Sequence, residues 1–472
     1  MNPNEMAALE KAIGEIWDVA QRLGLDPFPV HFEIVPATIM YEFGAYGLPG
    51  RFSHWTHGRA YQQIKTMYDY GLNRIYELVI NTNPAYAFLL ETNSLLQNKL
   101  VAAHVLGHAD FFKHNAYFRS TSRQMLETVS VHAERIRQYE FHHGQEQVEA
   151  FLDAVLSIQE HVDPFLAQRR KAATEPSKPA RPRETPYDDL FYLGSEKRPE
   201  PPPPVRKTPP EPEKDLLLFI AEHARELEDW QRDIIHIVRQ EQLYFVPQMQ
   251  TKIMNEGWAA YWHLQIMREL DLPQAEYMEF AALHANVLAP NRRSINPYHV
   301  GLKIWEDIER RWNEPTEEER RTLGRRGGEG RAKLFEVREL ENDVSFLRNY
   351  LTKELVEELD LYLYRYENGN WVIVEKDWEK VRDTLVASMT NFGQPYIVVE
   401  DGDYNRNREL YLRHCHEGRD LDMNYAERTL RYVYQLWGRT VHLETVLDGK
   451  VVVLSFDGER SRTRMGEAVR PA

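Results

Sequence analysis

The sequence holds a single cysteine among 472 residues. One cysteine cannot form an intramolecular disulfide, so the sequence excludes disulfide-stapled secreted domains and zinc modules that use several cysteines. A chain of this length can bury a large core without such links. At about 150 residues per domain, the length predicts two or three domains.

Long apolar runs are also missing. No run approaches the roughly 20 apolar residues that a membrane-spanning helix needs, so we expect no membrane span. The first residues include Glu5, Glu10 and Glu15 and no basic segment, and their apolar positions recur at helical spacing. This pattern predicts an amphipathic helix at residues 4–23 rather than a signal peptide. We therefore expect a cytoplasmic protein.

Positive charge is in deficit. The 58 Lys and Arg residues face 73 Asp and Glu residues, which gives a formal net charge of −15. Phosphate binding depends on clustered Lys and Arg, so this balance disfavours a nucleic-acid partner and an anionic membrane surface. The sequence also lacks a Gly-rich phosphate loop, a GxSxG nucleophile elbow and a kinase signature. The hydrophobic fraction of 42% nevertheless indicates a folded chain.

Proline is concentrated in one tract, residues 171–215, which holds twelve of the 26 prolines. Because proline cannot donate to a helix or a sheet, the tract is predicted to be extended. Within it, residues 186–194 carry five large apolar or aromatic side chains, and we predict that this segment docks on the folded body. The charged, Gly-rich residues 314–331 predict a mobile connector.

The chain before the Pro-rich tract has mostly helical patterns. An alternating run at 74–80 predicts a strand, and Pro84 is then placed for the first turn of a helix. Apolar spacing predicts helices at 92–114, 122–142 and 145–161.

Beyond the tract, residues 215–243 and 248–270 are predicted to be amphipathic helices separated by Pro247. The last third changes to alternating runs. Residues 361–375 and 440–456 are predicted to form β-hairpins that turn at Asn-Gly and Asp-Gly pairs.

These patterns predict an α+β fold. A mainly helical N-terminal body with a short sheet is expected to hold a zincin-like metal-site arrangement, and a smaller C-terminal α+β domain follows. The predicted divisions are a helical body at 1–170, the Pro-rich linker at 171–215, the second part of the helical body at 216–313, the connector at 314–334, the α+β domain at 335–460 and a tail at 461–472.

The first candidate site residues are His104 and His108, in the stretch NKLVAAHVLGHADFF. Their i, i+4 spacing on a helix places both imidazoles on one face about one turn apart, which is the geometry by which two histidines bind one zinc ion. The alternative is that both are ordinary helical histidines, because an isolated HxxxH is common.

Glu256 and His263, in IMNEGWAAYWH, lie two turns apart on one helix face. Gly257 and the alanines that follow keep part of that face small, so another backbone or a ligand can approach. A buried glutamate needs a partner. Glu256 is therefore expected either to pair with a basic residue at a helix crossing or to bind a metal.

Together, His104, His108 and Glu256 match a His₂Glu site, the type of zinc site that leaves a fourth position open for water or substrate. The order of a strand, an HxxxH helix and a later glutamate helix resembles the gluzincin metallopeptidases. One departure is Val105, which stands where the gluzincin motif has its general-base glutamate. We therefore expect zinc or another divalent metal at a site without its usual base.

Glu134 is the first candidate to replace that catalytic base. The alternative is a solvated carboxylate that pairs with Arg135 or Arg137. Asp110 and His263 are candidates to support the ligands or to contact substrate, although each would also fit an ordinary structural role.

His54 and Arg51 are candidate substrate contacts, because they lie in an irregular stretch of aromatic and glycine residues at 41–59. Such stretches suit the walls of a pocket. Anchoring of the loop would equally explain both residues.

Several long stretches are similar to one family. The segments FGAYGLPGRFSHW, YELVINTNPAYAFLLETNSLLQNKLVAAHVLGHADFFKHN, MNEGWAAYWH and YQLWGRTVHLET resemble the SpoVR family (stage V sporulation protein R), and the likeness runs from about residue 5 to 456. The resemblance implies a cytoplasmic bacterial protein that is tied to spore cortex formation in spore formers. In other bacteria it implies a role in stress physiology, beside a PrkA-like serine kinase and a YhbH-like protein.

Two hypotheses about function follow. The first is a metal-dependent, gluzincin-like hydrolase that acts on a peptide or amide bond of an envelope-related substrate. The second is a non-catalytic regulatory or scaffold protein that works with a PrkA-like kinase and in which any metal is structural. Val105 favours the second hypothesis, and the small-residue helix around Glu256 favours the first.

Overall fold

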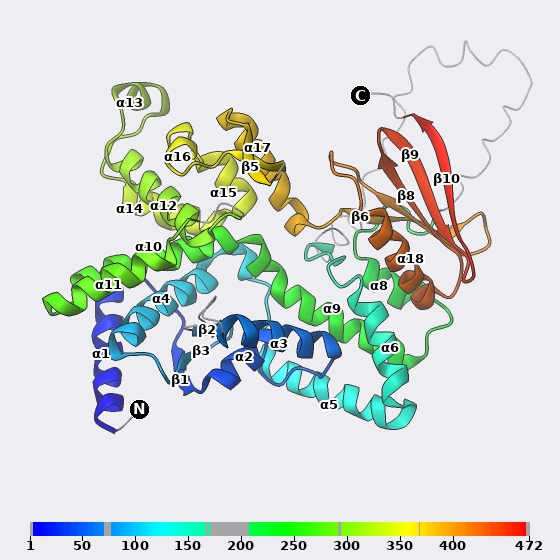
Figure 1. Ribbon diagram of the computed structural model, residues 1–472, viewed down its shortest axis with the longest axis horizontal. Coiled ribbons are helices and arrows are strands. Elements are labelled where there is room, and N and C mark those ends of the chain that lie inside the picture. Colours follow the sequence, from blue (N-terminus) through cyan, green and yellow to red (C-terminus); the bar gives the residue numbers. More distant parts are fainter. Residues whose placement is uncertain are drawn as a thin grey trace, which may run out of the picture. The chain divides into compact units, whose positions relative to one another are not determined.

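The computed structural model describes residues 3–69, 77–166, 169, 207–290, 294–367 and 369–468. Its contacts divide the chain into two compact units that alternate along the sequence (Figure 1). The first unit comprises Met1–Gln145 and Tyr244–Gln394, and the second comprises Glu146–Leu243 and Pro395–Ala472. No helix within the described ranges is long and apolar enough to cross a bilayer. The segment 186–194, for which docking was predicted, lies outside the described residues.

The first unit opens with helix α1 (Pro3–Arg22), which confirms the predicted amphipathic helix. A three-stranded sheet follows in the order β1–β3–β2. The central strand β3 (Ala85–Leu90) pairs in parallel with β1 (Val30–Val35) and antiparallel with β2 (Glu77–Ile80). Because β3 is covered on both faces, nearly all of its side chains are buried. β2 confirms the described part of the strand predicted at 74–80.

Helices α2 and α4 contact that sheet, and most of the other helices of this unit contact one another. Helix α4 (Leu95–His114) begins with a capping box formed by Ser94 and Gln97. The other helical elements are α2 (Ala37–Tyr46), α3 (Trp55–Asp69), η1 (Ala116–Phe118), α5 (Met125–His143), α10 (Lys252–Glu269), α11 (Gln274–Val287), α12 (Pro297–Asn313), α13 (Glu317–Leu323), α14 (Gly330–Leu340), α15 (Asp343–Tyr350), α16 (Lys353–Glu358), α17 (Trp378–Met389) and η3 (Thr390–Gly393).

Helix α10 is the centre of the core. It lies between α4 and α12 (Figure 1) and is buried on almost every face. Trp258 and Trp262 of α10 pack with Trp305 of α12 and Phe346 of α15 in one apolar cluster. A helix that is apolar all round needs such surroundings, since no face of it is suited to water.

Three local expectations differ from the structure. The predicted helical turn at Pro84 is wrong, because β3 follows it directly. Pro247 does not separate two helices but lies inside α9 (Asp229–Gln250), and the next helix begins only at Lys252. The connector predicted at 314–331 contains α13, whose first turn is stabilised by a capping box of Thr316 and Glu319.

The second unit contains a five-stranded sheet in the order β10–β9–β8–β7–β6. β7 (Glu409–His414) and β8 (Val441–Leu447) are parallel and are connected by α18 (Met423–Trp437), and the other neighbours are antiparallel. The turn between β8 and β9 (Lys450–Phe456) places Asp448 and Gly449 at positive φ, which confirms the predicted hairpin. The remaining elements are β6 (Ile397–Tyr404), β10 (Ser461–Ala468), α6 (Gln145–Leu156), α8 (Leu216–His223) and most of α9.

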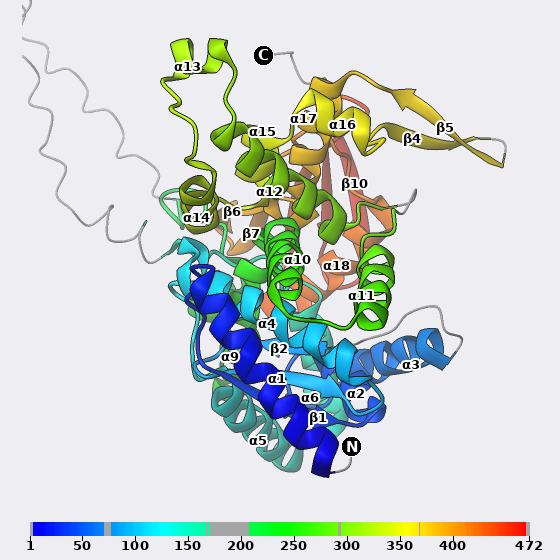
Figure 2. The same ribbon diagram turned by 90° about the vertical axis from the view of Figure 1, so that its left-hand side faces the viewer.

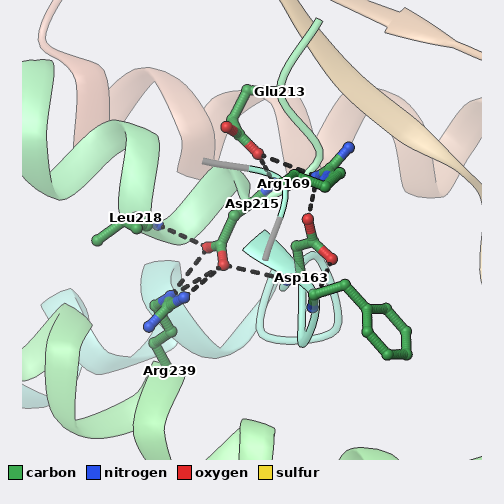
Figure 3. Close-up of polar contacts among 7 residues, drawn as sticks. Asp163, Arg169, Glu213, Asp215, Leu218 and Arg239 are labelled. Carbon is green, nitrogen blue, oxygen red and sulfur yellow. Dashed lines mark hydrogen bonds and ion pairs between the residues drawn. The ribbon is translucent and has the colours of Figure 1, made fainter. Parts of the chain in front are cut away.

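A buried ion-pair cluster anchors the start of α8 in this unit (Figure 3). Asp215 accepts hydrogen bonds from the backbone N–H groups of Leu218 and Asp163, each at 3.0 Å. Arg239 of α9 contacts both carboxylate oxygens of Asp215, and Arg169 pairs with Asp163. The cluster thus fixes the chain on both sides of the Pro-rich tract, because Asp163 precedes the tract and Asp215 ends it.

The residues expected to form one domain, 335–460, are divided between the two units at Gln394. Val337, Phe346 and Leu347 pack in the apolar core that also holds Trp258 and Trp305. The hairpin of β4 (Leu363–Glu367) and β5 (Asn370–Glu375) extends from α16 and α17 of this unit (Figure 2). It confirms the hairpin predicted at 361–375, although Asn368 of its turn lies outside the described residues.

Asp343 controls the start of α10. Its Oδ2 and Oδ1 accept hydrogen bonds from the N–H groups of Ile253 and Met254, both at 2.9 Å. The Thr251 side chain, which precedes the helix, makes no capping hydrogen bond. Burial raises the pKa of the Asp343 carboxyl to about 7, even though the backbone hydrogen bonds lower it.

This raised pKa predicts a pH dependence of stability. The folded protein binds the Asp343 proton more tightly than the unfolded chain does. Protonation of Asp343 therefore adds to the free energy of unfolding at low pH, and this contribution is lost as pH rises from about 4 to about 7. We expect the free energy of unfolding of the wild type to fall relative to Asp343→Asn over this range, by at most about 1.4 kcal/mol per pH unit. Urea titrations of both proteins at several pH values measure the difference, and a constant difference would contradict the raised pKa.

Candidate metal centre

His104 and His108 lie one turn apart on α4, and Glu256 lies on α10. Glu256 Oε2 is 3.8 Å from His104 Nε2 and 3.5 Å from His108 Nε2. One ligand atom from each residue lies within 4.8 Å of the other two. The imidazole side chains are 5% and 8% exposed, and the Glu256 side chain is 20% exposed. Three side chains of metal-binding type therefore converge at one mostly buried point.

Small residues allow the helices that carry these three side chains to pack closely against each other and against α12. A Cβ atom at Gly107 would lie 2.7 Å from the Cα atom of Ala259, and one at Gly257 would lie 2.4 Å from the backbone of Gly301 in α12. Gly107 lies between the two histidines in the sequence, and Gly257 follows Glu256. Larger side chains at these contacts would push apart the backbones that position the three ligands.

Asn255 fixes the orientation of His108. The Nδ1 atom of His108 lies 2.9 Å from Oδ1 of Asn255. A carbonyl oxygen only accepts hydrogen bonds, so Nδ1 carries the hydrogen and donates. The neutral ring then has its lone pair on Nε2, the atom that faces Glu256. This is the tautomer that a metal ion requires.

A chain of histidines begins at His104. Its Nδ1 lies 2.9 Å from Nδ1 of His263, whose Nε2 lies 2.7 Å from Nδ1 of His284 in α11. Burial lowers the pKa of His263 well below its usual value, and the neighbouring histidines lower it further, so this ring is neutral. A metal ion at this point would take the Nε2 lone pair of His104, and His104 Nδ1–H would then donate to His263 and His263 Nε2–H to His284.

Glu256 is ionised at neutral pH. Burial by itself would raise the pKa of its carboxyl, but hydrogen bonds and charge from the two facing imidazoles, in the forms that carry hydrogen on Nε2, outweigh burial and hold the pKa below its ordinary range. The group therefore offers a negative charge to the point where the imidazoles converge.

Aromatic rings flank both histidines. Tyr298 of α12 stacks on His104, with ring centroids 5.8 Å apart, and Phe112 stacks on His108 at 6.0 Å. These rings restrict the rotation of the imidazoles and exclude water from one side of each. One side of each imidazole is thus covered by an aromatic ring.

Val105 points away from the ligands. It is fully buried in a separate apolar cluster with Leu9 of α1 and Ala87 and Leu89 of β3. A glutamate at this position would place a carboxylate among aliphatic side chains rather than beside the ligand atoms, at a large cost in free energy. The packing around position 105 therefore suits a valine and would not direct a glutamate at the candidate ligands.

Glu134, the predicted substitute base, is not part of the three-residue group. It lies on an exposed face of α5, where its Oε2 accepts a hydrogen bond from Nη2 of Arg137 at 2.6 Å. This hydrogen bond, together with one from Gln138, lowers the pKa of Glu134. This arrangement matches the alternative given for Glu134, a solvated carboxylate that pairs with Arg137.

Asp110 is fully buried but serves the packing of α4. Its Oδ2 accepts hydrogen bonds from Arg338 of α14 at 2.7 Å and from the Trp258 indole at 3.0 Å, and Oδ1 accepts one from the Asp26 N–H at 2.9 Å. Its carboxylate therefore joins three elements of the core and is not available to the candidate ligands.

His54 and Arg51 lie in the loop between α2 and α3. His54 Nδ1 is 2.8 Å from the Thr56 hydroxyl, and Arg51 donates to the Tyr46 carbonyl at 3.2 Å and lies over the Phe52 ring. Arg51 also lies over the ring of Phe245 in α9. The structure does not bring either residue into the three-residue group.

The sequence did not point to Asn255, His284 or Tyr298. Asn255 directly precedes Glu256, so its position in MNEGW was the signal that could have identified it. Nothing in the sequence links the other two to the site, because they come from α11 and α12, which reach His104 only through the packing of helices around α10.

The contact between Gly107 and Ala259 yields a prediction. Gly107→Ala should destabilise the protein by about 1–3 kcal/mol, because the new Cβ would overlap the backbone of α10. Gly14→Ala is a matched control in α1, where a Cβ meets nothing within 4 Å, and it should be neutral or slightly stabilising. Thermal unfolding of both variants measures the difference, and equal melting temperatures would contradict the close approach.

Comparisons with known proteins identify the family. A family model described as SpoVR like protein matches residues 3–394, and one described as SpoVR-like C-terminal domain matches residues 395–448. A relative named "Uncharacterized protein YcgB", from Escherichia coli (strain K12), is 30% identical over 491 aligned residues, which cover 97% of this chain and 95% of the relative. No solved structure matches. The boundary between the two family models coincides with the division at Gln394, and the chain belongs to the SpoVR family.

Proposed function

We propose that this SpoVR-family protein binds one divalent metal ion, with zinc as the best candidate, through His104, His108 and Glu256, and that it uses the ion to hydrolyse a peptide or amide bond. The observation that supports this most strongly is the convergence of the three ligand atoms within 4.8 Å of one another, from helices far apart in the sequence. Both imidazole rings are fixed by hydrogen bonds at Nδ1.

The donor set and the spacing fit zinc. Zinc bonds to imidazole nitrogen and carboxylate oxygen are about 2.0–2.2 Å long, so ligand atoms of a tetrahedral site lie roughly 3.3 Å apart. The separations of 3.5 and 3.8 Å between Glu256 and the histidines need little adjustment to reach this value. A bound zinc ion with an open fourth position would lower the pKa of water and polarise a carbonyl group.

The residues of the chain have separate roles in this proposal. Glu256 supplies a negative charge that offsets part of the ion's charge. Asn255 and His263 hold the histidine rings in the ligand orientation. An envelope-related peptide as the substrate rests on the family's link with sporulation and on no contact within the chain.

A second candidate function is a regulatory or scaffold protein in which the metal is structural. The burial of Val105 in an apolar cluster favours it, because no base occupies the gluzincin position. No further carboxylate of the described residues belongs to the three-residue group. Work with a PrkA-like kinase and a YhbH-like protein would fit this candidate, on the strength of the family resemblance alone.

Loss of metal from ligand variants is the first test. We expect wild-type protein, purified after expression with added zinc, to carry about one metal ion per chain by mass spectrometry, since three fixed ligands form a strong site. His104→Ala, His108→Ala and Glu256→Gln should each lose most of it. Glu256→Gln is the sharpest change, because it keeps the shape of the side chain and removes its charge.

Two controls separate this effect from general damage. His54→Ala removes a buried histidine outside the group, and Glu134→Gln neutralises a carboxylate outside it; both should keep the metal. Metal-free wild type after expression with added zinc, cobalt or manganese would overturn the site. Stoichiometric metal with no cleavage of a diverse fluorogenic peptide library would remove the hydrolase and leave the structural candidate.

The residues that contact the Nδ1 atoms of the two histidines lead to a further prediction. Asn255→Ala and His263→Ala should each weaken metal affinity about 10–100-fold, because the rings lose the hydrogen bonds that fix their tautomers. Competition with a chromophoric chelator measures the affinity, with His54→Ala as the control. Unchanged affinity in both variants would show that the rings need no such support.

A further inference from the structure

The second unit carries a separate group of polar residues on one face of its sheet. Tyr411 of β7, His442 of β8 and Ser455 of β9 are directly opposite one another in the strand register, so their side chains share one face. Glu409 lies two residues before Tyr411 and faces the same way. The alternate residues of these strands, such as Leu443 and Leu454, are buried on the opposite face.

Two hydrogen bonds join three of these residues in series. His442 Nδ1 lies 2.7 Å from the Ser455 Oγ atom, and His442 Nε2 lies 2.9 Å from Oε2 of Glu409. A carboxylate only accepts, so Nε2 carries the hydrogen, and Nδ1 of the neutral ring accepts from the Ser455 hydroxyl. The serine hydroxyl is therefore bonded to a basic nitrogen whose ring is oriented by a carboxylate.

The carboxylate itself is held by a strained turn. Asn405 and Asn407 donate to Glu409 at 3.1 and 2.9 Å. In this turn Asn405, Arg406 and Arg408 adopt positive φ values of 57°, 58° and 64°, which residues other than glycine seldom adopt. Such strain gathers at places where a precise arrangement of side chains is maintained. The side chains of His442 and Glu409 are only 14% and 18% exposed.

We propose that Ser455, His442 and Glu409 form a serine-nucleophile site for acyl transfer, in which Ser455 attacks the carbonyl carbon of an ester. This arrangement of nucleophile, base and orienting acid is the one that activates serine in unrelated folds. Here the two imidazole nitrogens have exchanged their usual partners, since Nδ1 faces the serine and Nε2 faces the acid.

The proposed reaction is the hydrolysis of an ester through an acyl-serine, with water as the second reactant. Ser455 Oγ forms a bond to the carbonyl carbon while its proton moves to His442 Nδ1, and Glu409 stabilises the resulting imidazolium. The C–O bond to the leaving alcohol then breaks, and His442 gives that alcohol the proton. Water attacks the acyl-serine by the same route, its proton passes through His442 to Ser455 Oγ, and a carboxylic acid leaves.

The neighbouring strand indicates the class of ester. Arg462 of β10 is directly opposite Ser455, and Arg464 is opposite Val453 two residues along, so both side chains leave the strand on this face. The Arg462 guanidinium pairs with Asp457 at 3.0 Å. We assign Arg464 to an anionic group of the substrate. The site is therefore suited to an ester that carries a negative charge.

The first experiment labels the full-length protein with a fluorophosphonate, which reacts preferentially with activated serines, and locates the label by peptide mass spectrometry. We expect the label on Ser455 and its loss in Ser455→Ala. Ser461→Ala is the matched control, since it removes a serine of the same sheet. Treatment with a chelator should leave the labelling unchanged, which separates this site from the candidate metal centre in the first unit.

Two further variants test the roles of the partners. Glu409→Gln should slow labelling at least about 100-fold, and His442→Gln should abolish it, with melting temperatures measured to confirm that the fold is kept. Glu409→Gln is the decisive variant if His442→Gln fails to fold. Wild-type protein without label on Ser455, or labelling that is unaffected by Glu409→Gln, would overturn the proposal and leave a structural hydrogen-bond network on the sheet.

Discussion

Close contact between helix backbones is the constraint on which the first unit depends. Helix α10 touches α4 at Gly107 and α12 at Gly257 and Gly301, where no Cβ atom could be added without a shift of the backbone. These contacts permit the large side chains on the other faces of α10, such as Trp258, to fill the core. The same contacts bring the Glu256 carboxylate close to His104 and His108 of α4. The packing of the core and the geometry of the candidate metal centre therefore have a common cause.

The buried carboxylates of this unit differ in what balances them. Asp110 is paired with the guanidinium of Arg338, and Asp343 accepts hydrogen bonds from the start of α10. The groups that face Glu256 are two imidazoles, which carry a positive charge only when protonated. A divalent cation would supply that charge at all pH values at which the imidazoles are neutral. This contrast distinguishes the Glu256 position from an ordinary buried ion pair.

The sequence predicted what depends on local periodicity and spacing. The helices that hold His104 and Glu256 and the two hairpins follow from patterns within short windows. The group of three candidate ligands combined two windows that are far apart in the sequence, through their likeness to a His₂Glu site. The sequence could not predict Pro247 inside a helix or the burial of Val105 against β3, because neither has a local signature. The sequence also could not predict that residues 335–394 belong to the first unit. Their local helix and hairpin patterns are the same as those of an independent domain, and only long-range packing in the core that holds Trp258 assigns them to the first unit.

The two units interrupt each other along the chain, and this has a consequence for how the protein is made. Residues 1–145 emerge from the ribosome before the second half of their unit has been synthesised. The second unit likewise cannot fold completely until residues 395–472 have been synthesised. Helix α4 therefore spends the synthesis of more than a hundred residues without its partner α10, with an apolar face and two histidines uncovered. A nascent chain of this kind would be a natural client for chaperones, and its yield in the cell would depend on translation speed as much as on final stability.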